Sequence, residues 1–374
     1  MTTYAPIRSD VPLAELTTLR LGGPAQRLVR AESTQAVVDA VRAADADGEP
    51  LLVLGGGSNL VVADSGVPGT TVWVASTGRA IERTPDGGGL LTVAAGEDWD
   101  GVVAGALADG LAGLECLSGI PGRAGAVPVQ NVGAYGVEIA ELLVDVDLYD
   151  RRTGCVREHV PAGELRLVYR GSALKGRDDA VVLRIRLALP GGPLSGPIRY
   201  AELATALGLP LGARLPATEV REAVLALRRS KAMVLDAADH DTWSAGSFFT
   251  NPVVPAGVAD EVAAVAEGLV VAEGVAPATV GGSASGAGMP RYPAPDGQVK
   301  LSAAWLISRS GFERGRPGPG GRVGLSSRHS LALTNRGTGT TEDLLTLARE
   351  VRDGVRETFG VKLAPEPVLV GCRL

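Results

Sequence analysis

Residues 117–136 read LSGIPGRAGAVPVQNVGAYG, and we expect the rest of the chain to be organised around this stretch. It suits neither a regular helix nor a regular strand. Its glycines raise the entropic cost of ordering the backbone, and its prolines remove hydrogen-bond donors. The stretch is also nearly uncharged and too apolar for an ordinary solvent-exposed loop. We therefore predict a tightly bent, largely buried backbone whose N–H and C=O groups would be satisfied by a flat polar ligand.

The composition is typical of a globular protein with more than one lobe. The chain has 374 residues, of which 45% are hydrophobic and 21% charged, so two or three lobes with real cores are expected. A net charge of −6 without a basic stripe gives no reason to expect nucleic-acid binding. The three cysteines and three histidines are scattered singly, which predicts no bound metal. Since there is neither a signal sequence nor a membrane-spanning apolar run, we expect a cytoplasmic protein with no membrane partner.

A second glycine-rich loop, GGGSN at residues 55–59, follows a predicted strand over 50–54. A helix is predicted before that strand, over 34–46, and another strand after the loop, over 60–63. Three glycines followed by Ser and Asn can present several N–H groups, which suits a pyrophosphate. Glycine-rich connectors are common, however, so an ordinary connector remains the alternative. The loop is not the dinucleotide G-x-G-x-x-G motif, because a strand pattern follows it.

The rest of the chain alternates short strands with a few helices. Glycine-containing turns between alternating segments predict two hairpins, and apolar residues at helical spacing predict the helices. The predicted elements are a strand breaking into a Gly-Gly turn over 17–25, a strand over 71–75, hairpins over 80–94 and 144–159, a strand over 181–189, helices over 99–109, from Tyr200, over 218–230 and over 299–307, and a strand over 329–335.

Five separated segments carry a resemblance to a known family. In chain order they are LGGGSNL at 54–60, the stretch 118–136, VYRGS at 168–172, AGSFFTNP at 245–252 and LAPE at 363–366. Together they resemble the UDP-N-acetylenolpyruvoylglucosamine reductases, which are flavoenzymes of peptidoglycan precursor synthesis. The resemblance runs from Thr18 to the end of the sequence, and five motifs in one order are far more specific than any one of them.

The resemblance implies an α+β fold in three lobes. A two-lobed FAD-binding module of the vanillyl-alcohol-oxidase type would be followed by a third, substrate-binding α+β lobe. The expected lobes are residues 1–76, to which 362–374 would return, then 77–232, then 233–361. Two glycine-rich segments, 281–297 and 315–324, depart from the shorter family pattern and are predicted to be flexible surface insertions. Pro367 is a further departure, directly after Glu366.

The resemblance also implies which residues bind FAD. Residues 55–59 would hold its pyrophosphate, and the stretch 121–136 would line the flavin. Neither loop contains a histidine, so the FAD is expected to be bound non-covalently, with NADPH as co-substrate. The expected cofactor-binding residues are Gly55, Gly56, Gly57, Ser58, Asn59, Leu60, Ile120, Pro121, Gly122, Gln130, Asn131, Gly133 and Ala134.

The expected substrate is UDP-N-acetylglucosamine enolpyruvate, an enol ether that carries a carboxylate. The resemblance implies that Arg170 and a protonated Glu366 would stabilise negative charge on that carboxylate, while Ser247 would donate a proton as general acid. It also implies four substrate-binding residues, which are Tyr135, Tyr200, Lys231 and Asn251.

Each of these residues also has an ordinary interpretation. A serine after glycine is usually a turn residue, and a tyrosine at a helix start usually packs. Lys231 would be a favourable cation at the end of a helix. Arg170 and Glu366, taken alone, would be a surface arginine and a turn glutamate.

Two other functions therefore stay open, a flavin oxidase that uses oxygen and a binding protein without turnover. A monomer is expected.

Overall fold

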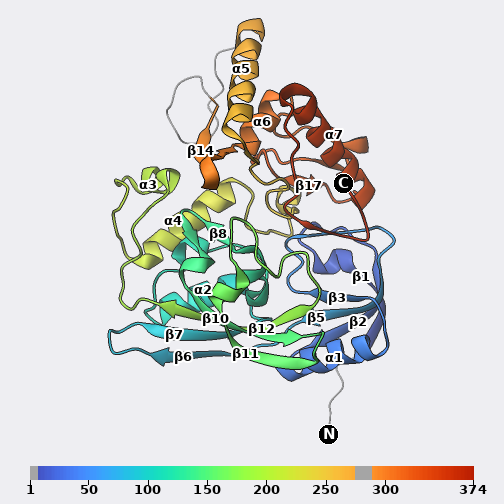
Figure 1. Cartoon of the computed structure of the whole chain (residues 1–374), viewed down its shortest axis with the longest axis vertical. Coiled ribbons are helices and arrows are strands. Elements are labelled where there is room, and N and C mark those ends of the chain that lie inside the picture. The colour runs from blue at the N-terminus through green and yellow to red at the C-terminus, as the bar shows by residue number, and fades with distance from the viewer. Residues whose placement is uncertain (1–6, 274–288) are drawn as a thin grey trace. The chain divides into compact units, whose positions relative to one another are not determined.

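The computed structural model describes residues 7–273 and 289–374, with side chains described except at 269–273 (Figure 1). The chain forms two compact units, each built from separate segments. Unit 1 comprises Met1–Thr18, Gly22–Ser58 and Ser65–Val234, and unit 2 comprises Leu19–Leu21, Asn59–Asp64 and Leu235–Leu374. The three expected lobes were drawn from the family resemblance and not from contacts within the structure. Their boundaries therefore stay a prediction.

A four-stranded sheet begins unit 1. Its order is β1-β2-β5-β3, with β1 antiparallel to β2 and with β2 and β3 parallel to β5. Helix α1 has the predicted bounds, because the Ser33 hydroxyl accepts a hydrogen bond from Ala36 N (3.1 Å) and caps its first turn. The elements are β1 (Ile7–Pro12), β2 (Pro24–Ala31), α1 (Thr34–Ala46), β3 (Leu51–Leu54) and β5 (Val67–Val74).

An antiparallel five-stranded sheet, in the order β11-β10-β12-β7-β6, is the larger sheet of unit 1 (Figure 1). Both predicted hairpins are confirmed as β6–β7 and β10–β11. Helix α2 buries Trp99 and Val103 against this sheet in a common apolar cluster. The elements are β6 (Arg79–Arg83), β7 (Gly89–Ala94), α2 (Trp99–Ala108), β10 (Leu143–Asp150), β11 (Cys155–Pro161) and β12 (Ala180–Leu189).

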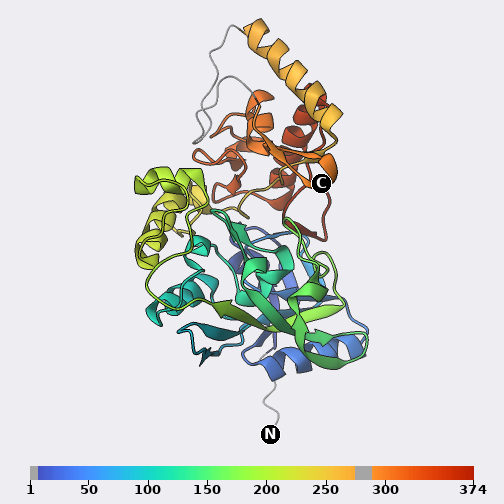
Figure 2. The same cartoon turned by 60° about the vertical axis from the view of Figure 1, so that its left-hand side comes forward.

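The stretch 117–136 has the bent backbone predicted for it, but it is only partly buried, since half of its residues are half-buried and two are exposed. It contains two 3-10 turns, Ala124–Ala126 and Pro128–Gln130, and the short strand β8 (Gly133–Ala134), which pairs with β9 (Val137–Glu138). Two helices follow later in unit 1, α3 (Ala201–Leu207) and α4 (Ala217–Ser230). They lie side by side in both views and share a small apolar cluster (Figure 2).

The core of unit 2 is built from helices and from short strands of several small sheets. Strands β13, β15 and β14 form one sheet in that order, β16 pairs with β17, and β4 pairs in parallel with β18. None of the described helices has the length and apolar composition needed to cross a bilayer. The elements are β4 (Leu60–Val62), β13 (Val253–Val254), α5 (Ala256–Glu273), β14 (Arg291–Pro293), β15 (Val299–Leu301), α6 (Ala303–Arg309), β16 (Val323–Leu325), β17 (Leu333–Asn335), α7 (Thr341–Phe359) and β18 (Val368–Val370).

Three predictions about unit 2 are wrong in part. Within the predicted insertion 281–297, residues 281–288 lie outside the described residues, but Arg291–Pro293 forms β14 and pairs with β15. The predicted insertion 315–324 ends in β16, where Val323 is fully buried in the core, so apolar burial fixes this segment. The predicted helix over 299–307 begins as β15, and α6 starts only after Ser302 caps it.

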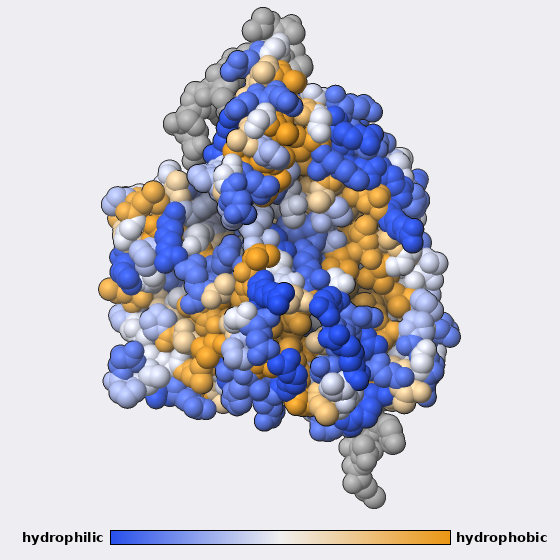
Figure 3. Space-filling model, in the orientation of Figure 1, coloured by the Kyte–Doolittle hydropathy of each residue, from blue (hydrophilic) through white to orange (hydrophobic). Residues whose placement is uncertain are grey.

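On the face of the molecule shown in Figure 3, hydrophilic and apolar side chains both occur across the surface. This mixture fits the moderate fraction of charged residues in the sequence, 21%. Exposed apolar side chains of this kind are normal in globular proteins. The face therefore gives no separate indication of a partner.

Candidate active site

The loop after β3 requires glycine at two of its positions, 56 and 57. Gly57 has a φ of +59°, and a Cβ there would lie 2.1 Å from the Leu16 carbonyl oxygen. A Cβ on Gly56 would lie 2.7 Å from the Cα of Gly122. Gly55 is the least crowded of the three, with 3.6 Å from its ideal Cβ to the Cβ of Arg123. The two loops predicted to bind the cofactor therefore meet backbone against backbone within unit 1.

Gly122 completes this contact. Its φ is +130°, and a Cβ on it would lie 2.8 Å from the Ser58 hydroxyl oxygen. Gly56, Ser58 and Gly122, three of the predicted cofactor-binding residues, thus lie together. Ile120 and Pro121, which precede Gly122, are half-buried.

Gln130 ends the 3-10 turn Pro128–Gln130 and is half-buried. Its side-chain oxygen is fully buried and accepts no hydrogen bond from any residue that the structure describes. A buried acceptor without a partner is costly, so it needs a donor from a bound group or water. Together with the crowded glycine backbones, this oxygen fits a polar, planar group such as a flavin, and Gly133 and Ala134 follow three and four residues later.

Asn131 lies at a left-handed φ of +45° and is 1% exposed. Its Nδ2 donates to Glu138 Oε2 (2.8 Å) and to Val168 O (3.1 Å), and its Oδ1 accepts from Ala140 N (3.2 Å). The amide therefore fastens the stretch 117–136 to the VYRGS segment. Sequence reasoning assigned Asn131 to the cofactor, and its partners within the chain were not anticipated.

Arg170 lies in a tight turn that the rest of this segment holds closed. Val168 and Gly171 exchange two backbone hydrogen bonds, and the Ser172 hydroxyl donates to Val129 O (2.8 Å). Arg170 has a φ of +54°, and its Nη1 lies 3.3 Å from the place that a Cβ on Gly133 would occupy. The structure thus brings the predicted catalytic arginine beside the predicted flavin-lining loop.

Tyr135 and Tyr200 lie edge to face, with ring centroids 5.5 Å apart. Burial raises the pKa of Tyr135 to about 12, so its phenol is a hydrogen-bond donor at neutral pH. Lys231 lies at the end of α4, and its Nζ contacts Glu202 Oε2 on α3 at 2.6 Å. The structure brings these three predicted substrate-binding residues to α3 and α4. Glu202 was missed because nothing in the sequence links it to Lys231.

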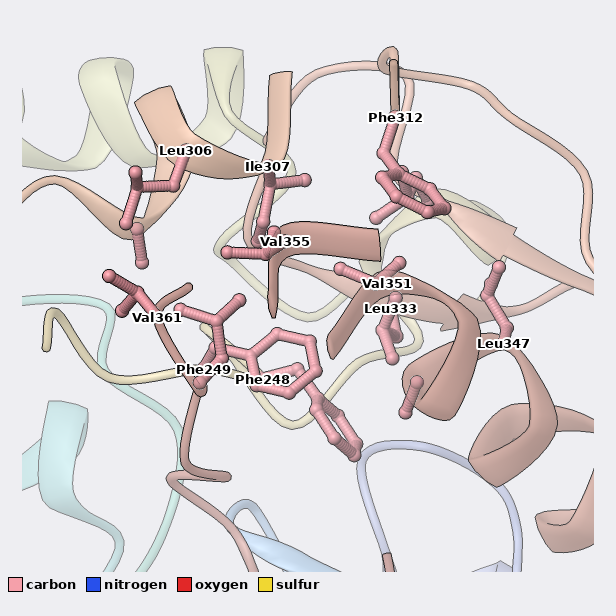
Figure 4. Packing of buried hydrophobic residues seen from close by; sticks show 14 of the residues in the cluster. Phe248, Phe249, Leu306, Ile307, Phe312, Leu333, Leu347, Val351, Val355 and Val361 are labelled. Atoms are coloured by element: carbon pink, nitrogen blue, oxygen red, sulfur yellow. The ribbon is translucent and has the colours of Figure 1, made fainter. Parts of the chain in front are cut away.

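Ser247 lies in a bend of unit 2 between a glycine and two buried phenylalanines. Gly246 has a φ of +73°, and its N–H donates to the Ser244 hydroxyl (3.2 Å). Phe248 and Phe249 are each 1% exposed, with ring centroids 5.1 Å apart. Figure 4 shows both rings in the core of unit 2. The apolar core therefore fixes the backbone directly after Ser247.

Glu366 lies on the backbone that pairs with this bend. Its N–H donates to Phe248 O (2.9 Å), and Thr250 N donates to Ala364 O (3.1 Å), so the two segments run antiparallel. Asn59 donates from Nδ2 to Glu366 O (3.3 Å) and accepts at its own carbonyl from Val368 N (3.0 Å). Asn59 thus holds the backbone that carries the predicted carboxyl group, Leu60 begins β4 and pairs with Val368, and Pro367 directly precedes β18.

Asn251 also has a structural partner in unit 2. Its Oδ1 accepts from Ala303 N (2.9 Å) in the first turn of α6. Of the predicted site residues, those of unit 2 are Asn59, Leu60, Ser247, Asn251 and Glu366, and the others belong to unit 1. Among the residues described, His, Cys, Asp and Glu form no group that could hold a metal ion.

Comparisons with known proteins first define a class. Residues 25–158 match the FAD-binding domain family, so the chain is a protein with an FAD-binding domain in an α+β fold. Residues 237–370 match the C-terminal domain of UDP-N-acetylenolpyruvoylglucosamine reductase.

Individual relatives agree with both matches. The chain is 61% identical to the UDP-N-acetylenolpyruvoylglucosamine reductase of Saccharopolyspora erythraea, over 97% of this chain and 95% of that protein. It is 56% identical to the enzyme of the same name from Nocardia farcinica, over 100% and 92%. The crystal structure of the reductase from Thermus caldophilus aligns with a TM-score of 0.62 at 25% identity, over 98% of this chain and 100% of that one. This chain belongs to the UDP-N-acetylenolpyruvoylglucosamine reductase family.

Proposed function

We propose that this protein uses NADPH and non-covalently bound FAD to reduce UDP-N-acetylglucosamine enolpyruvate to UDP-N-acetylmuramate. The proposal rests on family membership and on one observation within unit 2. That observation is the backbone hydrogen bond from Glu366 N to Phe248 O, which pairs the backbone of an acidic residue with the residue that follows Ser247. A carboxyl group and a hydroxyl group held on paired backbones suit a substrate that needs both charge stabilisation and a proton.

The cofactor assignment rests on unit 1. Gly56, Gly57 and Gly122 leave no room for side chains, so their backbones can approach a phosphate or a ring closely. The buried Gln130 oxygen can accept a hydrogen bond from a ring N–H. Bound FAD would supply hydride transfer between NADPH and the substrate. Because residues 55–59 and 117–136 contain no histidine, we propose that the FAD has no histidine link.

The chemistry of the substrate explains the proposed side chains. The ether oxygen of an enol ether feeds electrons into the double bond, so the alkene resists hydride unless charge is withdrawn through its carboxylate. Arg170 and a protonated Glu366 would stabilise the negative charge that develops there. Ser247 would donate its hydroxyl proton to the carbon beside the carboxylate. One hydride and one proton thus add across the double bond.

The nucleotide part of the substrate would use the tyrosine and lysine side chains at α3 and α4. Tyr135 is a protonated donor, and Tyr200 is 44% exposed at the start of α3, so both can contact a polar ligand. Lys231 would bind the diphosphate, and Glu202 would hold its ammonium group in place before the ligand arrives. Asn251 would contact the sugar nucleotide from the loop before β13.

Spectroscopy of the purified protein tests the proposal. We expect a yellow protein that releases FAD on acid precipitation, loses its flavin absorbance on anaerobic addition of NADPH and regains it on addition of UDP-N-acetylglucosamine enolpyruvate. Release of FMN, or flavin that stays attached to the denatured protein, would contradict the cofactor assignment. Rapid reoxidation by air without the sugar nucleotide would indicate an oxidase instead.

A further inference from the structure

Asp241 is a buried carboxylate outside the set of predicted site residues. It lies in the 3-10 turn His240–Thr242 of unit 2 and is 8% exposed. Four donors from one loop converge on it. Ser326 Oγ (2.9 Å), Ser327 N (3.0 Å), Ser327 Oγ (3.0 Å) and Arg328 Nε (3.2 Å) all donate to its oxygens.

The loop that these donors belong to continues directly to the bend that carries Ser247. The Ser326 hydroxyl accepts from His329 N (3.1 Å), which shapes the loop after Arg328. Two residues later, the carbonyl of Leu331 accepts from Phe248 N (2.7 Å). A short chain of hydrogen bonds thus links Asp241, through residues 326–331, to the residue that follows Ser247.

The surroundings of Asp241 favour a charged carboxylate that accepts hydrogen bonds in one position. Burial opposes ionisation, but hydrogen bonds from Ser327, Ser326 and Arg328 outweigh it and hold the pKa of the carboxyl group below its usual range. Arg328 also pairs with Asp239, and Arg336 lies 3.9 Å from Asp241. The carboxylate is therefore charged at neutral pH, its own oxygens accept from hydroxyl, amide and guanidinium donors, and the neighbouring carboxylate of Asp239 accepts from Asp241 N (3.0 Å).

We propose that Asp241 is a positioning residue for Ser247, acting through the loop 326–331 and the Leu331–Phe248 hydrogen bond. The inference rests on the proposed function, in which Ser247 donates a proton to the substrate. A hydroxyl misplaced by about 1 Å donates its proton much more slowly. A small displacement of the loop 326–331 would therefore slow the step that needs Ser247. Asp241 itself touches no reacting atom in this account.

Asp241→Asn is the informative change because it keeps the shape of the side chain. The asparagine oxygen can still accept from Ser327 N, but its NH₂ group cannot accept from Arg328 Nε, so the loop loses part of its support. Ser327→Ala is a milder variant that removes one hydroxyl donor and leaves the Ser327 N–H in place. It keeps the proposal testable if Asp241→Asn folds poorly.

Asp343→Asn is a matched control. Asp343 is also 8% exposed in unit 2, and its carboxylate accepts from Arg322 Nε (2.8 Å) and Nη2 (2.6 Å) and from Thr340 N (3.0 Å). Those contacts hold the first turn of α7 and do not involve residues 326–331. The control therefore loses comparable charge-assisted hydrogen bonds without the proposed coupling.

The first measurement does not depend on catalysis. In the FAD-bound protein, amide hydrogen exchange of the peptide that covers residues 244–250 reports on the Phe248 N–H. We expect Asp241→Asn to speed that exchange by roughly tenfold, Ser327→Ala by less, and Asp343→Asn to leave it unchanged while speeding exchange at the start of α7. Unchanged exchange at 244–250 in both loop variants would overturn the proposed coupling.

The second measurement separates the two half-reactions by stopped-flow absorbance. Asp241→Asn should leave flavin reduction by NADPH within about twofold and slow reoxidation by the enolpyruvyl substrate by roughly ten- to a hundredfold. Equal slowing of both steps, or equal effects in Asp343→Asn, would make Asp241 a stability residue only. If the wild-type protein itself fails to use the substrate, the proposed function fails instead, and the exchange result still decides the coupling.

Discussion

The backbone around Arg170 in unit 1 and the backbone around Ser247 in unit 2 are held in different ways. In unit 1, a buried amide, a hydroxyl and crowded glycines fix the turn, since Asn131 and Ser172 hydrogen-bond across segments and Gly133 leaves room for the guanidinium. In unit 2, backbone hydrogen bonds with Leu331 and Glu366 shape the bend, and two phenylalanine rings anchor it in the apolar core. Hydrogen bonds demand one geometry, whereas apolar packing tolerates small shifts.

This difference teaches where each site is vulnerable. The loops of unit 1 should lose their conformation when a single atom is added to a glycine or when one hydrogen-bond donor is replaced by an acceptor. The bend of unit 2 should fail when volume is removed from the core beneath it. The following changes sharpen or break the contrast, beginning with the largest expected effect.

Gly57→Ala should abolish FAD binding. A non-glycine residue at positive φ is strained by about 1–2 kcal/mol, and here the new Cβ would also meet the Leu16 oxygen at 2.1 Å. The matched control is Gly48→Ala, with a φ of +65° and nothing within 4 Å of the new Cβ. Flavin absorbance per protein and the melting temperature should fall severely for Gly57→Ala and slightly for Gly48→Ala. Normal flavin content in Gly57→Ala would contradict the crowded-glycine account.

Phe248→Ala tests the anchoring of Ser247. Removing a buried phenylalanine typically costs about 3–5 kcal/mol, and the bend should lose its fixed position as well. Phe312→Ala is the control, since Phe312 lies in the same core but is not a neighbour of Ser247 in the sequence. Both variants should unfold at lower urea concentration, but only Phe248→Ala should slow substrate-dependent reoxidation disproportionately. Identical kinetics in the two variants would remove the anchoring role.

Asn131→Asp tests the polar support in unit 1. A carboxylate at this 1% exposed position would face Glu138 Oε2 and Val168 O, which costs about 2–3 kcal/mol because buried donors are replaced by acceptors. Asn335→Asp is a matched control, because Asn335 is 2% exposed and its amide donates to two carbonyls in unit 2, those of Leu19 and Arg20.

Thermal unfolding should show similar losses for the two asparagine variants. Flavin retention and the reoxidation step should suffer more in Asn131→Asp, since Asn131 supports the turn that holds Arg170. If Asn131→Asp lowers only FAD affinity and leaves reoxidation of the remaining holoenzyme intact, the amide serves the cofactor and not Arg170.

The smallest expected effect concerns pH. Hydrogen bonds from Arg322 outweigh the opposing effect of burial and, with those from Thr340, lower the pKa of Asp343 to about 2. A lowered pKa stabilises the folded state above the unfolded value near 3.8, and this stability is lost as the pH falls toward 2. The advantage of wild type over Asp343→Asn should be about 1–2 kcal/mol at pH 7 and should shrink between about pH 4 and pH 2. A difference in urea unfolding that stays constant over this range would show that the ion pair contributes nothing.

Local signals in the sequence predicted the elements that depend on local chemistry. Helix α1 has a serine cap and an apolar stripe, and the first hairpin turns on a glycine-rich segment, so both were predicted within about one residue. The bent character of 117–136 followed from its glycines and prolines. The predicted site residues of unit 1 came from the family resemblance, which five motifs in one order carry, and not from local chemistry.

Long-range partners could not be predicted. The segment 17–25 was predicted to be a strand that breaks at Gly22-Gly23, whereas residues 19–21 are irregular and β2 begins only at Pro24. Leu19 and Leu21 pack in the core of unit 2, and Asn335 holds their backbone from more than 300 residues away. The pairing of β4 with β18, and the contact of Asp241 with residues 326–328, likewise join distant segments. No periodicity within one segment reports such partners.

The most direct test of the account is Ser247→Ala followed through both half-reactions by stopped-flow absorbance. Flavin reduction by NADPH needs no proton from Ser247, so it should keep nearly its normal rate. Reoxidation by UDP-N-acetylglucosamine enolpyruvate should fall by at least about 10²-fold, and Ser247→Cys should recover part of it because a thiol can also donate a proton. Equal slowing of both steps in Ser247→Ala would contradict the account, because Ser247 would then shape the flavin pocket and the proton would come from another group.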